Sequence, residues 1–92
     1  MVEISMVWVF NGSRANFPAG IFSNREIAEA WISKHRLTGV LTCYPVDHGA
    51  YDWSIEQGIF TPKKQEHMSP DFIQKFGCAS FDHYHYEDGV RA

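Results

Sequence analysis

With 92 residues, the chain is long enough for one small domain and too short for two, so we expect residues 1–92 to form a single domain. Apolar residues make up 45% of the sequence and aromatic residues 15%, a composition that excludes a disordered chain. Eleven acidic residues against eight Lys and Arg give a net charge of -3, which disfavours nucleic acid as a partner and favours a basic protein.

The N-terminus and the cysteines predict a cytoplasmic location. The first ten residues lack the basic segment of a signal peptide, and their apolar run is too short to span a membrane. Cys43 and Cys78 have neither the spacing of a metal site nor that of a secreted disulfide scaffold. We therefore expect two reduced thiols in the core, with a disulfide between them as the alternative.

Two strands joined by a turn are predicted at the start of the chain. Residues 4–10 are nearly all β-branched or aromatic, the pattern of a central strand whose two faces are both partly covered. Asn11-Gly12 is a strong turn signal. Residues 17–22 then return as a second strand, and Pro18 assigns this strand to a sheet edge.

The best-marked element is a helix over residues 24–36. Ser23 and Glu26 have the spacing of a capping box, in which each side chain bonds to the backbone amide of the other residue. Phe22 and Ile27 have the spacing of a hydrophobic staple across the same turn. The sequence therefore predicts a helix whose first turn is fixed by both devices.

One broad face of this helix is apolar, as expected for a helix that lies on a sheet. Its residues are Ile27, Ala28, Ala30, Trp31 and Ile32. After the helix, residues 40–46 have the alternation of a third strand. The second strand lies at the sheet edge, and the helix connects it to the third strand. This connection places the third strand on the far side of the first strand, which gives the local order second, first, third.

The second half of the chain is less regular. Residues 50–57 predict a short helix, residues 61–67 an exposed loop, and residues 70–76 another short helix. Ser69 is suited to cap this last helix, and Pro70 to occupy its first position.

The chain is expected to end with a fourth strand over residues 81–86, after which residues 87–92 fray. The predicted fold is therefore an α+β domain with a mostly antiparallel, four-stranded sheet, one main helix and two short helices. The order of the strands beyond the first three stays open.

Two histidines raise the question of a metal site. His83 and His85 lie two apart on the last predicted strand, so both point to the same side and can reach one ion. A third ligand would have to come from a separate element, and no recognised spacing supplies one. We favour a half-exposed strand without metal, assign no cofactor and no catalytic residue, and keep a small metal protein or enzyme as the alternative.

Aromatic residues interleaved with acids suggest a protein-binding surface. Rings anchor a partner by burial, and carboxylates select a basic partner by charge. The candidate residues are Tyr84, Tyr86, Glu87, Asp88, Asp47, Asp52 and Trp53. The competing interpretation is that these rings belong to the core and that the acids only keep the surface polar.

The chain resembles an uncharacterised family of short bacterial proteins, and the resemblance covers nearly its whole length. The shared pieces are Val7–Phe10, Phe17–Phe22, Ala30–Ile32, Leu37–Gly39, Tyr44–Val46, Tyr51–Trp53, Phe60–Lys63 and His85–Gly89. This resemblance implies a single-domain unit and supplies no catalytic residue. As a small acidic α+β protein, the chain is also similar in kind to bacterial immunity proteins, which cover a toxin.

These features predict a small protein-binding module, of the immunity-protein kind, that covers a basic partner with an acidic and aromatic surface. A metal protein or enzyme that uses His83 and His85 is the second hypothesis. Binding of single-stranded nucleic acid by stacked rings is the third, and the net charge disfavours it.

Overall fold

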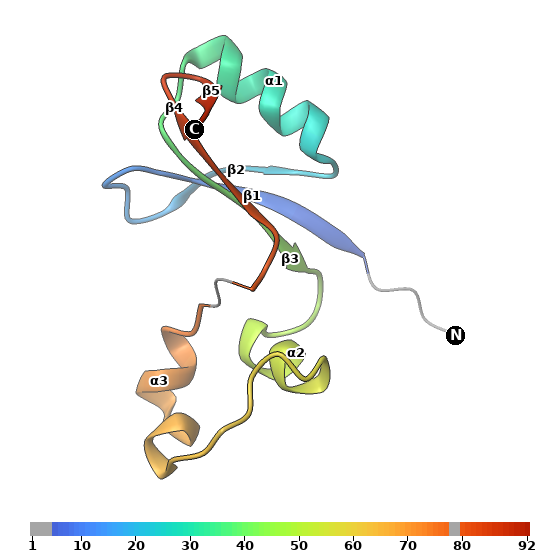
Figure 1. Cartoon of the computed structure of the whole chain (residues 1–92), viewed down its shortest axis with the longest axis vertical. Helices are drawn as coiled ribbons and strands as arrows, with labels where there is room; N and C mark the ends of the chain where they lie inside the picture. Colours follow the sequence, from blue (N-terminus) through green and yellow to red (C-terminus); the bar gives the residue numbers. More distant parts are fainter. Residues whose placement is uncertain (1–4, 78–79) are drawn as a thin grey trace. The chain divides into compact units, whose positions relative to one another are not determined.

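The computed structural model describes residues 5–77 and 80–92, and the chain forms two compact units (Figure 1). We call Met1–Val46 together with Phe81–Ala92 the sheet unit, and Asp47–Ser80 the helical unit. Cys78 and the first residue of the predicted strand 4–10 lie outside the described residues. No helix in the described part of the chain is long and apolar enough to cross a membrane.

The sheet unit contains one antiparallel sheet with the order β2-β1-β3-β4-β5. Its strands are β1 (Met6–Gly12), β2 (Pro18–Phe22), β3 (Gly39–Pro45), β4 (His83–Glu87) and β5 (Val90–Arg91). The predicted α+β class and the local order second, first, third are both confirmed. The sequence does not predict the position of the fourth strand. In the structure, β4 pairs with β3 on the side away from β1.

A fifth strand replaces the predicted frayed end, so the expectation for residues 87–92 is wrong. Asp88 and Gly89 form a two-residue loop in which both have positive φ, 49° and 85°. This is the backbone that a tight hairpin with right-twisted strands requires, and Asp-Gly is among the dipeptides that favour it. The Gly89 amide also donates to the Leu37 carbonyl oxygen at 2.8 Å, which ties the loop to the rest of the unit.

The main helix, α1 (Arg25–His35), begins one residue later than the capping box predicts. Asn24 is the N-cap, and its side-chain oxygen accepts from the Ile27 amide at 2.9 Å. Asn caps at least as well as Ser, and with this start Ser23 lies outside the helix. The predicted capping box between Ser23 and Glu26 and the staple at Ile27 are therefore wrong.

The buried face of α1 is narrower than its sequence suggests. Ala28 and Ile32 are fully buried and lie four residues apart, one turn above the other. Trp31 is half-buried, whereas Ile27 and Ala30 are exposed. Ala30 lies about 200° around the helix from Ala28, so the two cannot share one face.

The core of the sheet unit lies between α1 and one face of the sheet (Figure 1). Phe10 from β1, Leu41 from β3 and Tyr86 from β4 form it together with Ala28 and Ile32. Strand residues alternate between the two faces, so the neighbours of these residues along each strand point to the opposite side of the sheet.

The helical unit has three short helices: α2 (Ala50–Glu56), the 3-10 helix η1 (Gln65–Met68) and α3 (Pro70–Gln74). The prediction of a loop over residues 61–67 is wrong for its last three residues, which belong to η1. The predicted cap is confirmed, because Ser69 Oγ accepts from the Phe72 amide at 3.2 Å and Pro70 is the first residue of α3.

Candidate functional site

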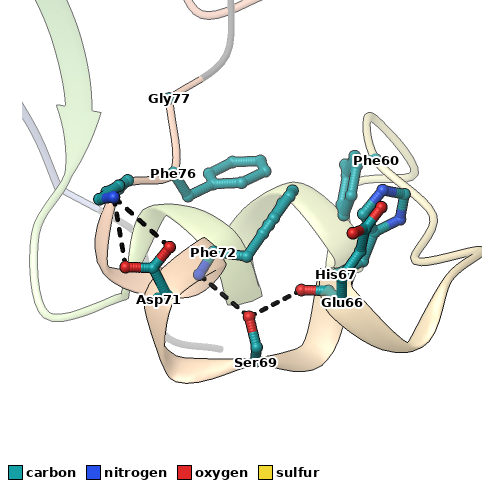
Figure 2. A pocket seen from close by; sticks show the side chains of 9 residues that line it. Phe60, Glu66, His67, Ser69, Asp71, Phe72, Phe76 and Gly77 are labelled. Atoms are coloured by element: carbon teal, nitrogen blue, oxygen red, sulfur yellow. Dashed lines mark hydrogen bonds and ion pairs between the residues drawn. The ribbon is translucent and has the colours of Figure 1, made fainter.

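The helical unit contains a hollow of about 580 Å³, within the range of small-ligand and side-chain pockets (Figure 2). We call it the groove. Four rings line it, those of Phe60, His67, Phe72 and Phe76, and the acids Glu66 and Asp71 border it. All of the described residues that line the groove belong to the helical unit.

Ser69 sets the geometry of the groove by joining η1 to α3. Its hydroxyl donates to the Glu66 carbonyl oxygen at 2.8 Å and accepts from the Phe72 amide at 3.2 Å (Figure 2). The chain therefore turns sharply here, and the rings of His67 and Phe72 come to 4.8 Å between centroids. Pro70 supports the turn because its fixed φ suits the first position of a helix.

The rings of the groove pack on one another and still keep accessible surface. Phe60 stacks on Phe72 at 5.7 Å and meets Phe76 edge-on at 5.2 Å. Tyr51, which is 8% exposed, backs them from α2 at 5.5 Å from Phe76. Phe60, Phe72 and Phe76 are only half-buried, so an apolar group can pack on them without a rearrangement.

His67 also fixes the chain that leads into the groove. Its Nδ1 accepts a hydrogen bond from the Lys63 amide at 3.1 Å. Only a neutral ring with its proton on Nε2 can accept at Nδ1. This bond holds residues 63–67 as a closed turn, with the His67 ring against Phe60.

The two acids at the border of the groove each have a lysine partner. Glu66 Oε1 lies 3.8 Å from Lys64 Nζ, and Asp71 Oδ1 lies 3.2 Å from Lys75 Nζ. All four side chains are exposed, and ion pairs of this kind contribute little to stability. A cation of a partner can therefore replace either lysine at small cost.

The helical unit has a net charge of -2, out of the -3 of the whole chain. Its acids are Asp47, Asp52, Glu56, Glu66 and Asp71, against Lys63, Lys64 and Lys75. In the rest of the chain, six acids nearly balance five Lys and Arg. The aromatic groove and the excess of acid thus occur in the same unit.

Of the predicted partner-binding rings, Tyr86 is not available. It is 5% exposed, lies in the core under α1, and its hydroxyl donates to Glu29 Oε2 at 2.5 Å. Burial first, and then this hydrogen bond, raise the pKa of the Tyr86 hydroxyl well above its usual value. The prediction that Tyr86 anchors a partner is wrong, because strand alternation indicates two sides but not which of them a helix covers.

Tyr84 is half-buried on the same side of β4 and is surrounded by cations. The guanidinium carbon atoms of Arg25 and Arg91 lie 4.7 and 4.6 Å from its ring centroid. Arg25 Nη1 also donates to the Tyr84 hydroxyl at 2.5 Å. A ring that already contacts two arginines of its own chain is poorly suited to attract a basic partner.

The predicted acidic residues are all exposed but are divided between the two units. Glu87 ends β4, and Asp88 lies in the loop after it, where its amide donates to Thr38 Oγ1 at 3.0 Å. Asp47 and Asp52 belong to the helical unit, as does Trp53, which is half-buried. None of these three lines the groove.

The family assignment rests on a match that covers nearly the whole chain. A family model for a domain of unknown function, DUF7710, matches residues 7–92 and so takes in both units. The chain belongs to the DUF7710 family. This confirms the resemblance to an uncharacterised family. No curated protein and no solved structure matches the DUF7710 chain.

The two histidines predicted as a possible metal pair lie close together in this DUF7710 chain. The rings of His83 and His85 lie 5.3 Å apart, as their spacing predicts. His83 Nδ1 contacts the Phe81 carbonyl oxygen at 2.8 Å, which leaves Nε2 as its free nitrogen. Among the described residues, no group of three or more His, Cys, Asp or Glu is placed to hold a metal ion.

Cys43 is buried in β3 with a free thiol, as expected for a core residue. Burial, and to a lesser extent the nearby Asp82 carboxylate, raise the pKa of this thiol. A protonated, buried thiol is a poor nucleophile.

Sequence reasoning missed the rings of the groove, although one signal for them exists. Phe72 and Phe76 lie four residues apart, a spacing that brings side chains to the same side of a helical turn. A loop over residues 61–67 gives His67 no defined position, so the sequence alone does not place its ring beside these two phenylalanines.

Proposed function

We propose that this DUF7710 chain is a cytoplasmic protein-binding module and that its groove holds a basic segment of a partner protein. The observation that carries the proposal is the combination of accessible rings and exposed carboxylates around one hollow. As with small immunity proteins, the chain would act by covering its partner and would need no catalytic group.

The chemistry of the groove suits a long basic side chain next to a bulky apolar one. The stem of Lys or Arg packs on aromatic rings, while its charged end stays at the border of an apolar surface. Phe60, Phe72 and Phe76 offer the ring surface, and Glu66 and Asp71 offer the charge. Ring faces also attract a cation directly.

Peptide selection tests the proposal before any partner protein is identified. Random peptides displayed on phage and selected against the full chain should converge on Lys or Arg beside a bulky apolar residue. A synthetic peptide of that sequence should bind the wild type and lose affinity about tenfold or more with Phe72→Ser, because a central ring of the contact is removed.

Two matched controls sharpen this experiment. Ile73→Ser changes the next residue of α3, which is 38% exposed and outside the groove, and should leave affinity unchanged. Glu66→Gln should lower the affinity and reduce its dependence on salt. Glu56 is an exposed acid outside the groove, so Glu56→Gln should change neither. Selection of acidic peptides, equal losses with Phe72→Ser and Ile73→Ser, or tighter binding of a single-stranded oligonucleotide would reject the proposal.

A further inference from the structure

The two edges of the sheet differ in length and in charge. β5 forms one edge with two residues, and Glu87, Asp88 and Arg91 lie in or beside it. β2 forms the other edge with five residues, and no charged residue or histidine occurs between residues 15 and 24. Charges and short length are the usual protection of an edge strand against pairing with another chain. The β5 edge has both, and the β2 edge has neither.

The β2 edge also exposes large apolar side chains. Phe17, just before the strand, is 79% exposed, and Ile21 within it is 67% exposed. Among the described residues, no strand pairs with the outer side of β2. Pro18 and the irregular register at Ala19, which has no partner between Phe10 and Asn11 of β1, limit pairing at the start of the strand and leave residues 20–22 with a regular outer edge.

We propose that two copies of this chain pair through β2, antiparallel across a twofold axis, so that their two sheets become one. Across such an axis the same patch meets itself, so any charge near the axis faces a like charge. An uncharged edge strand can therefore pair with the same strand of a second copy without repulsion between like charges. The same strand offers no charge that would attract a basic or an acidic partner. The surface elsewhere carries the net charge of -3 and repels a second copy.

The pairing brings apolar residues of the two copies together on one side of the joined sheet. Ile21 lies opposite Val9 in the β1–β2 register, on the sheet face away from α1. Its symmetry mate approaches from the neighbouring copy on the same face. A contact of one short strand from each copy is smaller than the roughly 1,000 Å² of a permanent interface, so the dimer is weak and depends on concentration.

Sedimentation equilibrium of the full chain from about 10 µM to 1 mM, the range in which weak complexes dissociate, measures this association. The average mass should rise toward twice that of the monomer. Ile21→Lys should raise the concentration of half-dimerisation about tenfold or more, because two like charges then meet across the axis. Val90→Lys makes a similar change on the other edge, at a residue 69% exposed, and should have no effect. A monomer at every concentration, or equal effects of the two variants, overturns the proposal.

Amide exchange of the wild type decides the question even if Ile21→Lys fails to fold. Raising the concentration should slow exchange at the outward-facing amides of residues 20–22 and leave Val90 and Arg91 unchanged. Slowing at neither edge, or only at β5, rejects pairing through β2. The groove lies in the other unit, so Phe72→Ser should dimerise as the wild type does.

Discussion

The sheet unit and the helical unit are stabilised in different ways. In the sheet unit, strands that are distant in sequence pair with each other, and Phe10, Ile32 and Leu41 are at most 2% exposed. The helical unit has helices of only four to seven residues around rings that are mostly half-buried. Short helices depend on such side-chain packing, because they are not stable alone. We infer that the sheet unit supplies stability and that the helical unit supplies an adaptable surface for binding.

The largest loss of stability is expected from Leu41→Ala. This side chain is fully buried in the centre of the sheet, and its removal leaves a cavity worth about 3 kcal/mol of unfolding free energy. Val40→Ala, one residue away on the opposite, half-buried face, should cost about 1 kcal/mol. Urea titration measures both, and equal costs would show that the core does not lie between α1 and the sheet.

Phe72→Ala should act on the helical unit alone. Loss of its contacts with Phe60 and His67 should lower local stability by about 1–2 kcal/mol and speed amide exchange of α2 and α3 about 5- to 30-fold. Exchange in β1 and β3 should not change. If those strands exchange faster by the same factor, the two units open together and the contrast between them fails.

Tyr86→Phe should change how stability depends on pH. Burial and the bond to Glu29 raise the pKa of this hydroxyl in the folded state above its unfolded value of about 10. The contribution of this hydroxyl to folding stability is therefore complete below about pH 10. It is lost as the pH rises further, because the hydroxyl then ionises more easily in the unfolded chain than in the folded one. The variant should lose about 1 kcal/mol at pH 7, from the missing hydrogen bond, and decline less steeply between pH 9 and pH 11. Parallel declines in urea titrations of the two proteins would contradict this assignment.

The smallest effect distinguishes the two possible caps of α1. Asn24→Ala should cost about 1 kcal/mol, since the Ile27 amide loses its acceptor. Ser23→Ala should cost less than about 0.5 kcal/mol, because Ser23 lies outside the helix. If Ser23→Ala lowers stability more than Asn24→Ala in thermal unfolding, Ser23 is the cap of α1 and the predicted capping box is correct.

Local patterns in the sequence predict much of the fold and little of the site. Alternation and helical periodicity locate β1 to β4 and the helices α1, α2 and α3 to within a few residues, because these signals act between near neighbours in the chain. The turn predicted at Asn11-Gly12 is wrong, because β1 continues through Gly12 and pairs there with β3. Asp88-Gly89 is a local signal of the same kind, because this dipeptide favours the tight turn found between β4 and β5. Which face of β4 becomes core depends on where α1 lies, and for this reason Tyr86 was wrongly assigned to the surface.

The groove was harder to predict because its rings come from separate short segments. Phe60, His67 and Phe72 meet only after Ser69 has joined η1 to α3 through two hydrogen bonds. No periodic pattern links a residue before a loop to residues after it. For the same reason, the surface proposed from Glu87 and Asp88 and that from Asp47 and Asp52 turned out to belong to different units.

The most direct test of the groove as the binding site is amide chemical-shift mapping of the isotope-labelled full chain. It is titrated with the basic peptide obtained by selection. We expect the largest shifts at Phe60, His67 and Phe72, with β1 and β3 unchanged. Shifts confined to β4 and the loop at Asp88, with none in the groove, would contradict a binding site in the helical unit.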